Sequence, residues 1–425
     1  MTMVYILALN PSILSASGMD AGAILTATAV ASAVACFCMA AFSNKPFALS
    51  AGLGLNAYFA YTICGSMGYS WQIALFAVFV EGIIFIVLSL TNVREAIFNA
   101  IPLQLKKGVS VGIGLFVAFI GLQNGKIVVD STTLVSLVDF RQDFHTVGIS
   151  ALLAIIGTFI IAILYVKKVR GAILIGIFAT WILGIICQFT GIYTVVPEAG
   201  YYSLIPAWSS FNLGAISSTF GQCFKADFNG LKIFDFIAIV FSFLFVDIFD
   251  TLGTLIGCAN KADMLDKDGK LPRIKEALLA DAIATSAGAV LGTSTTTTFV
   301  ESSAGVAEGG RTGLSSIVTG LLFLVAIFLS PIFIAIPGFA TAPALLFVGF
   351  LMISAVVDID FSDFTEAVPA YLALIFMPLT YSISEGIAAG VISYVVINLV
   401  CGKAKKITPL MYILAILFVA KFIFL

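Results

Sequence analysis

The chain has 425 residues, of which 60% are hydrophobic and only 10% are charged, and its formal net charge is −2. Soluble domains carry roughly 25% charged residues, so this composition excludes an ordinary soluble fold. A net charge so close to zero gives no reason to expect a nucleic-acid partner.

Apolar runs recur along the whole chain, and each is near the length of ~20 residues that crosses a bilayer core. The backbone cannot bond to water at that depth, so each run is predicted to be a helix. The regular alternation of an outer-membrane barrel strand is absent from the sequence. The expected class is an all-α polytopic membrane protein. We predict helices near residues 2–17, 21–42, 71–91, 107–124, 147–166, 170–191, 232–258, 275–291, 313–336, 340–357, 385–401 and 407–425.

The first of these helices is expected to lack its beginning. The apolar run Met1–Ser15 is short, and no charged region precedes it, so a signal peptide is not expected. We interpret this run as the outer half of a first span.

Two stretches do not have the pattern of a plain spanning helix. Residues Ser43–Cys64 and Gly292–Gly310 mix small or β-branched residues with glycines and then turn apolar. Each is predicted to cross the membrane with part of its backbone extended. A third segment, Asp363–Tyr381, contains two prolines, and the sequence leaves open whether it lies at the interface or forms a broken span.

Lysine and arginine cluster in loops, and the side of the membrane on which these clusters fall tests the predicted topology. If the two unusual stretches each cross once, four clusters fall on one side, which the positive-inside rule makes the cytoplasm. A fifth cluster, Lys403–Lys406, joins them only if Asp363–Tyr381 also spans, and the sequence does not decide this. The four clusters are Arg94/Lys106/Lys107, Lys167/Lys168/Arg170, Lys261–Lys275 and Arg311.

The two unusual stretches occupy corresponding places, because each is the third element of its half of the chain. Each half has an odd number of predicted spans, so the halves are expected to be inverted relative to each other. Paired interrupted segments of this kind mark the midplane binding site of a secondary transporter. We predict an N-terminal seven-span repeat at residues 1–191, an external connector at 192–231 and a C-terminal seven-span repeat at 232–425.

Two carboxyl groups lie inside the apolar helix predicted at 232–258. An ionisable residue at a helix centre costs about 2.5–3.5 kcal/mol, so Asp247 and Asp250 are informative. Their spacing of three puts both on one helix face, where repulsion favours a proton on one of them. We expect the pair to serve proton coupling. The structural alternative is a pair bonded to hydroxyls such as Thr251 and Thr254.

Glu301 follows a run of threonines, Thr295–Thr298. If this run is extended, Glu301 opens a half-helix whose N-terminal amides face the midplane. A carboxylate there can accept hydrogen bonds from the N–H groups of a planar heterocycle. The alternative is a helix cap that faces no ligand.

Gly54 and Asn56 occupy the corresponding break in the first half. Glycine lets the backbone approach a ligand closely, and an asparagine amide offers a base edge both a donor and an acceptor. The alternative is tight helix packing. Nearby aromatic rings are candidates to sandwich an aromatic ligand, with ordinary apolar bulk as their alternative role. These rings are Phe249, Phe299, Tyr58 and Phe59.

Two further acids lie in apolar runs. Glu81 is expected to make a structural hydrogen bond between helices, and Asp281 to bond the strand region or join a proton path. His145 is interpreted as a solvated loop residue, and the seven cysteines as inert thiols without metal-ligand spacing. No phosphate loop, nucleophile triad or metal-ligand cluster appears, so neither an enzyme nor a cofactor or metal site is expected.

Four segments together resemble the AzgA-like hypoxanthine/guanine/adenine permeases of the nucleobase/ascorbate transporter superfamily. They are NKPFALSAGLGLNAYFAYTICG, FVDIFDTLGTLIGCANKADMLD, TSTTTTFVESSAGVAEGGRTGL and IFMPLTYSISEGIAAG. The resemblance implies fourteen spans in two inverted sevens, sorted into a core and a gate domain, with short antiparallel strands at about 47–53 and 295–300. It implies import of purine nucleobases by proton symport across the cytoplasmic (inner) membrane. A homodimer is left as an open expectation.

The resemblance also implies a site between these strands and span eight. Asp247 and Glu301 would bind the base, and Asp250 would assist in proton handling. The acids of spans eight and ten would share substrate and proton, so Asp247 and Glu301 would also take part in proton coupling. The other residues expected at the base are Asn56, Thr298, Phe299 and Gly54.

Other functions remain as alternatives. The same fold with another cargo, such as uracil, xanthine, ascorbate or an inorganic anion, is the main one, although the acids at the site disfavour an anion. A channel would need a continuous polar stripe on several helices, which the predicted helices do not have.

Overall fold

A computed structural model describes residues 3–91, 102–132, 134–141, 143–206, 213–261, 264, 271–299, 301–307 and 309–424. Within these ranges, seven helices are long and apolar enough to cross a membrane. They are Ala21–Ser43, Trp71–Leu90, Leu103–Asn124, Phe144–Val166, Ala172–Phe189, Leu314–Ile334 and Gly338–Asp358. The prediction of a mostly helical polytopic fold is confirmed, and the expected number of fourteen spans stays a prediction.

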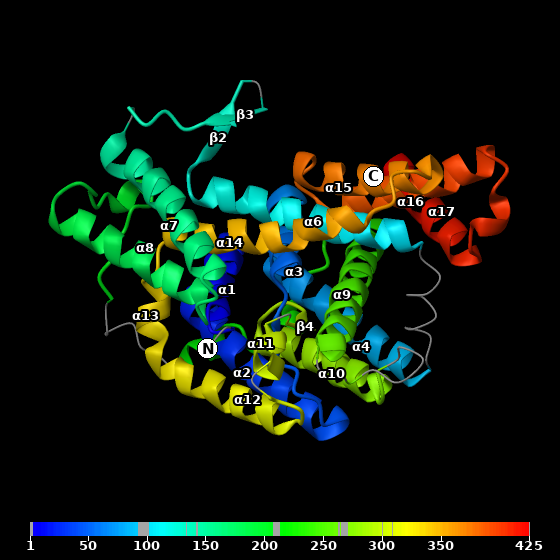
Figure 1. Ribbon diagram of the computed structural model, residues 1–425, viewed down its shortest axis with the longest axis horizontal. Helices are drawn as coiled ribbons and strands as arrows, with labels where there is room; N and C mark the ends of the chain where they lie inside the picture. Colours follow the sequence, from blue (N-terminus) through cyan, green and yellow to red (C-terminus); the bar gives the residue numbers. More distant parts are fainter. Residues whose placement is uncertain are drawn as a thin grey trace.

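The helices follow the predicted apolar runs closely. They are α1 (Ile6–Leu14), α2 (Ala21–Cys38), α3 (Leu53–Ala57), α4 (Trp71–Leu90), α6 (Leu103–Asn124), α7 (Ile149–Val166), α8 (Ala172–Phe189), α9 (Ile233–Lys261), α10 (Ile274–Leu291), α11 (Ser302–Ala307), α12 (Leu314–Ala326), α13 (Ser330–Ile334), α14 (Gly338–Ile353), α15 (Phe364–Leu379), α16 (Ile383–Val400) and α17 (Pro409–Phe424). A π-helical segment, η3 (Tyr58–Ser66), continues α3. The prediction did not include a hairpin of β2 (Val128–Ser131) and β3 (Leu134–Leu137) that projects from the helices in Figure 1.

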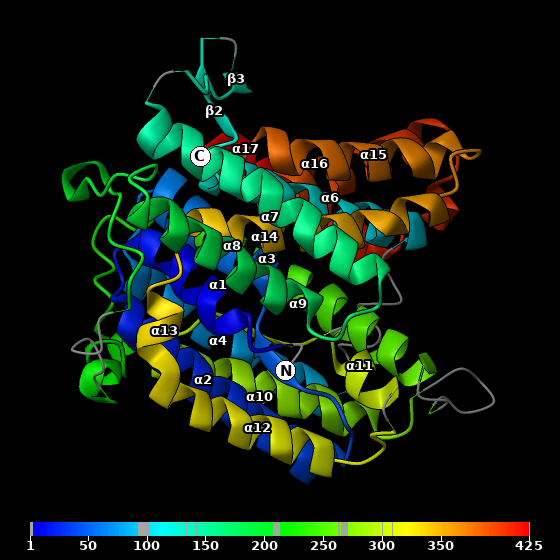
Figure 2. The same cartoon turned by 60° about the vertical axis from the view of Figure 1, so that its left-hand side comes forward.

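The helices form two groups with a third set of short elements between them. Helices α2, α4, α10 and α12 lie on one side, where α10 packs on α2 and α4, and α12 packs on α2 (Figures 1 and 2). Helices α6, α14, α15 and α16 lie on the other, where α6 packs on α14 and α15. The short helices α1 and α3 lie between these groups in both views.

The packing pairs recur in a second set along the chain. The contact of α2 with α12 has a counterpart in that of α10 with α4, and the contact of α7 with α14 has one in that of α15 with α6. Likewise α7 packs on α8 as α15 packs on α16. Each of the first two pairs joins one helix from each half, and in its counterpart the halves exchange roles; the third pair lies within the first half and its counterpart within the second.

The two unusual stretches meet as the predicted strands. Strand β1 (Leu49–Ala51) pairs antiparallel with β4 (Thr296–Thr298), with Ser50 opposite Thr297. The predicted strands at 47–53 and 295–300 are therefore confirmed at their centres. At Gly52, which follows β1, an added Cβ would lie 3.0 Å from the Thr297 hydroxyl oxygen, so the two strands approach more closely than a larger residue would allow without adjustment.

The segment with two prolines is a continuous helix, α15. Pro369 has no N–H, so the Thr365 carbonyl loses its usual partner within the helix. The Asn398 side chain of α16 donates to that carbonyl at 3.0 Å, and Asn398 is fully buried. A neighbouring helix therefore restores the hydrogen bond that proline removes, as membrane helices require.

Contacts at one end of the molecule place the basic loop that the sequence left unassigned. The Lys403 ammonium lies 3.1 Å from the Asp363 carboxylate, just before α15. The Lys107 ammonium, at the start of α6, donates to the Asp358 carbonyl a few residues earlier. The loop at 403–406 therefore lies at the same end as Lys107.

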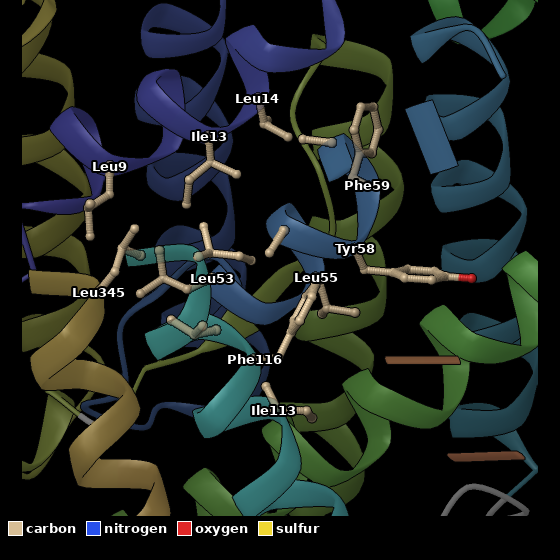
Figure 3. Close-up of a cluster of buried hydrophobic side chains, with 14 of the residues drawn as sticks. Leu9, Ile13, Leu14, Leu53, Leu55, Tyr58, Phe59, Ile113, Phe116 and Leu345 are labelled. Atoms are coloured by element: carbon tan, nitrogen blue, oxygen red, sulfur yellow. The ribbon is translucent and has the colours of Figure 1, made fainter. Parts of the chain in front are cut away.

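A cluster of buried apolar side chains holds the first broken segment in place. Side chains of α1 face those of α3 and η3, and α6 and α14 close the cluster from the other side (Figure 3). The labelled members are Leu9, Ile13, Leu14, Leu53, Leu55, Tyr58, Phe59, Ile113, Phe116 and Leu345.

Candidate functional site

Glu301 lies between β4 and α11, where the second broken segment turns from strand to helix. Its carboxylate oxygen Oε1 accepts a hydrogen bond from the Tyr5 hydroxyl at 2.5 Å. Tyr5 precedes α1 and is 1% exposed. The sequence did not single out Tyr5, because a tyrosine inside an apolar run ordinarily only fills the core. The signal present in the sequence was its phenol hydroxyl, which needs a hydrogen-bond partner when it is buried.

Asp247 and Asp281 form a second acidic centre around one hydroxyl. The Thr251 oxygen Oγ1 lies 2.8 Å from Asp247 Oδ1 and 3.2 Å from Asp281 Oδ1, and all three residues are 0% exposed. A hydroxyl has one hydrogen to donate and otherwise accepts. Both contacts are therefore satisfied when one of the two acids is protonated and donates to Thr251.

Asp250 lies between these two centres. Thr297 of β4 makes a side-chain hydrogen bond to Asp250, and the charges of Asp281 and Glu301 are both near enough to act on it. Asp250 and Glu301 are partly accessible, in contrast to Asp247 and Asp281. The structure thus brings together the three predicted acids, Asp247, Asp250 and Glu301. Asp281 is a fourth acid in the same region.

Asn56 and Thr298 carry polar atoms that are buried without a partner among the described residues. The Asn56 oxygen Oδ1 accepts from the Ser294 hydroxyl, and its nitrogen Nδ2 has no partner in that part of the chain. The Thr298 oxygen Oγ1 is likewise unpartnered there. Buried polar groups almost always find a hydrogen bond, so these two atoms need an explanation.

Gly54 and Phe299, which are also predicted to contact a ligand, both contact other parts of the protein. A Cβ at Gly54 would lie 2.7 Å from Ile113 of α6, so close packing gives this glycine a structural reason. Phe299 is 7% exposed, and its amide bonds to the Ala48 carbonyl at 3.0 Å. The ligand roles of Gly54 and Phe299 stay predictions.

The aromatic rings proposed to sandwich a ligand are engaged with the protein. Tyr58 packs edge-on against Phe243, with ring centroids 5.1 Å apart, and Phe59 lies in the apolar cluster of Figure 3. The side chain of Phe249 lies outside the described part of the structure.

Glu81 makes a structural hydrogen bond, as expected, and the bond reaches the second broken segment. Its Oε2 accepts from the Thr295 hydroxyl at 2.7 Å. The bond ties α4 to the residue just before β4. In the described part of the chain, no group of three or more His, Cys, Asp or Glu side chains is placed to hold a metal ion.

A cavity of about 470 Å³ opens at the end of the molecule opposite Lys107. Pro11 and Ser12 of α1, Tyr61 of η3, and Asn124 and Lys126 at the end of α6 are among its lining residues. The Asn124 amide donates to the Tyr61 hydroxyl at 3.2 Å. This contact joins the first broken segment to α6 beside the cavity.

Comparisons with known proteins identify the family of the chain. The model of the Permease family, Xan_ur_permease, matches residues 1–389. The chain is 42% identical to the guanine/hypoxanthine permease PbuG of Bacillus subtilis, covering 100% of this chain and 94% of that one. It is 40% identical to the adenine permease AdeP of Escherichia coli, covering 100% of this chain and 91% of that one.

A solved structure shares the fold at low sequence identity. The transmembrane domain of the cyanobacterial bicarbonate transporter BicA matches with a TM-score of 0.63 and 15% identity, over 92% of this chain and 94% of that one. A likeness at this identity concerns the fold alone. The family match and the identities to the permeases together show that this chain belongs to the xanthine/uracil permease family, a family of nucleobase permeases.

Proposed function

We propose that this chain imports purine nucleobases, namely adenine, guanine or hypoxanthine, together with protons. The single observation that carries the proposal is the closeness of Asp250 to Thr297 and Glu301 where two broken segments cross, on which Asn56 and Thr298 also carry buried polar atoms without a partner among the described residues. The relatives PbuG and AdeP, which carry purine names, support the choice of substrate. The membrane would be the cytoplasmic (inner) one.

The polar atoms around this crossing match a purine edge. Purines present N–H donors beside ring-nitrogen acceptors. The carboxylates of Asp250 and Glu301 can accept from the N–H groups, and the unpartnered Asn56 Nδ2 can donate to a ring nitrogen. Burial of a base there would give these atoms the partners that they lack among the described residues.

The acids suggest how protons are carried. The resemblance implies that Asp247 binds the base and that Asp250 assists with the proton. Burial favours the reverse, because Asp250 is partly accessible beside Glu301, whereas Asp247 is fully buried and shares Thr251 with Asp281. We assign proton carriage to the Asp247–Thr251–Asp281 centre and base contact to Asp250 and Glu301.

Alternating access would move the two groups of helices against each other. The recurrence of packing pairs between the halves supports two inverted seven-span repeats, at 1–191 and 232–425, and fourteen spans in all. The group of α2, α4, α10 and α12 would form the core, and the group of α6, α14, α15 and α16 the gate. The cavity beside Tyr61 and Asn124 lies where the core meets the gate, as an outer entrance would.

Uptake of labelled hypoxanthine and adenine by bacterial cells lacking their own purine carriers tests the proposal. Uptake should be concentrative and should collapse with a protonophore. Unchanged accumulation without a proton gradient would reject the coupling. Full transport by both Asp250→Asn and Glu301→Gln would reject the site. Competition by uracil, xanthine and sulfate in the same cells distinguishes the alternative cargoes.

A further inference from the structure

Two polar side chains at α1 contact the second broken segment (residues 292–310) on either side of β4. Tyr5, the residue before α1, donates to Glu301 Oε1 at 2.5 Å. Asn10, within α1, donates from Nδ2 to the Thr293 hydroxyl at 3.0 Å. Thr293 lies three residues before β4, and Glu301 lies three residues after it. Helix α1 therefore contacts both ends of the extended part of this segment.

The strand pairing itself fixes only the middle of the segment. Strands β1 and β4 share three residue pairs, and a two-stranded ladder is marginally stable by itself. Before β4, the Thr295 hydroxyl donates to Glu81 of α4, and after β4 the Ser302 hydroxyl accepts from the Ala48 amide at 2.9 Å. These contacts hold the segment near β4, but neither of them sets the direction of the Glu301 side chain.

Helix α1 is held firmly enough to support the segment. Tyr5 is 1% exposed and Asn10 is fully buried. The Asn10 amide nitrogen also donates to the Thr28 hydroxyl at 2.5 Å, which ties α1 to the spanning helix α2. The apolar side chains of α1 are buried, and the helix packs on α2 and α3. A displacement of α1 would leave buried polar groups unpaired, which is costly.

Among the described residues, Tyr5 is the side-chain donor that reaches Glu301. The two oxygens of an ionised carboxylate offer about four acceptor positions, so the Tyr5 hydroxyl and the N–H groups of a base can bind the same carboxylate. The terminal torsion of a glutamate has no strongly preferred angle, so without Tyr5 the carboxylate would rotate. Binding of a base would then have to fix that rotation, which lowers affinity.

The contact of Asn10 supports Asn56, which is another proposed contact of the base. Thr293 is followed by Ser294, whose hydroxyl donates to Asn56 Oδ1. Fixing Thr293 therefore also fixes Ser294, and with it the amide group whose Nδ2 is buried without a partner among the described residues.

We propose that Tyr5 and Asn10 are positioning residues, through which α1 orients Glu301 and Asn56 before a purine base arrives. This inference rests on the proposed function. Neither residue needs to touch the base, because each acts through a residue of the second broken segment.

Tyr5→Phe tests the first contact, because it keeps the ring and removes the hydroxyl. KM and Vmax of labelled hypoxanthine uptake are measured in bacterial cells that lack their own purine carriers. Loss of orientation weakens binding, so we expect KM to rise about three- to tenfold. A residue that only stabilises the fold would lower Vmax with the amount of carrier and leave KM unchanged, and that result would overturn the role of Tyr5.

Asn10→Leu tests the second contact. Leucine is similar in size and has no amide, and the Thr28 and Thr293 hydroxyls, which lie 3.2 Å apart, can still bond to each other. We expect KM to rise here as well. Thr293→Val should raise KM by a similar factor, and the double variant should raise it no further, because Asn10 acts through Thr293. An unchanged KM, or factors that multiply in the double variant, would overturn the role of Asn10.

Two matched controls carry the same chemistry away from the site. Tyr69→Phe removes a phenol that donates to Asp235 Oδ2, also at 2.5 Å, before α4. Asn398→Leu removes a fully buried amide of α16 whose Oδ1, like that of Asn10, has no partner among the described residues. Both controls should keep the wild-type KM even where Vmax falls. A rise in their KM equal to that of the test variants would overturn the proposal.

The outcomes separate this inference from the proposed function. Absence of uptake of any purine by the wild type would reject the proposed function itself. Intact wild-type uptake with an unmoved KM in both Tyr5→Phe and Asn10→Leu would reject only the positioning role of α1. If Tyr5→Phe does not reach the membrane, Asn10→Leu decides alone.

Discussion

Replacing Thr251 by valine should separate proton movement from base binding. The hydroxyl lies 2.8 Å from Asp247 and 3.2 Å from Asp281 and is the described group that joins them. Valine keeps the shape of the side chain but cannot donate or accept. Hydrogen bonds to charged groups contribute about 1.5–3 kcal/mol, and each 1.36 kcal/mol is a factor of ten, so we expect the proton-carrying step to slow about tenfold to a hundredfold.

The assay compares two modes of transport in liposomes that contain the purified carrier. Net uptake of hypoxanthine driven by a pH gradient requires the proton step, whereas exchange of labelled for unlabelled base at equal concentrations does not. Thr251→Val should lose net uptake and retain exchange, and Thr251→Ser, which keeps the hydroxyl, should retain both. Equal loss of both modes, or equal behaviour of the valine and serine variants, would refute the assignment of the proton to this centre.

Three further substitutions test other parts of the structure. Thr298→Val should leave thermal stability unchanged or slightly higher, because the buried hydroxyl has no partner among the described residues, and should raise the KM for hypoxanthine about tenfold; an unchanged KM would remove Thr298 from the site. Gly82→Ala should lower stability by about 1–3 kcal/mol in thermal unfolding, because the new Cβ would lie 2.8 Å from a backbone nitrogen of α10, and a neutral result would show that α4 and α10 can separate freely. Hydrogen bonds from the Thr365 hydroxyl and, to a smaller extent, from the Lys403 ammonium hold the pKa of the Asp363 carboxyl well below its usual value of about 3.9. The stability that Asp363 contributes is therefore present above about pH 4 and lost as the pH falls through its folded pKa, so Asp363→Asn should destabilise at pH 7 and match the wild type in strong acid; a gap independent of pH would contradict this.

The broken segments were predictable because their composition conflicts with their surroundings. Threonines and glycines interrupt otherwise apolar runs at 43–64 and 292–310, and few physical solutions allow such a run to cross a membrane. The resemblance then supplied the strand pairing, which β1 and β4 bear out. The acids were predictable for the same reason, since a carboxyl in hydrocarbon is costly.

The orientation of the acids was not predictable from spacing. A spacing of three residues places Asp247 and Asp250 on one face of α9. Several elements contact that face at once. Asp247 meets Thr251 and Asp281, while Asp250 meets Thr297 of β4. Which neighbour each carboxyl reaches depends on how α9 is rotated against α10 and β4, and helical periodicity in one segment does not carry that information.

Tyr5 and Asn398 show a second limit, because each answers a need created far away in the sequence. Asn398 supplies a donor that Pro369 removed from α15, and Tyr5 supplies a donor to a carboxylate 296 positions later. Either residue alone is one polar tip in an apolar helix, which is compatible with many roles. Each acquires a specific role only when the fold pairs it with an unmet hydrogen-bonding group. A search for further functional residues of this carrier should therefore begin from buried polar atoms that lack a partner among the described residues, such as Asn56 Nδ2 and Thr298 Oγ1, and ask which atoms of a bound base complete them.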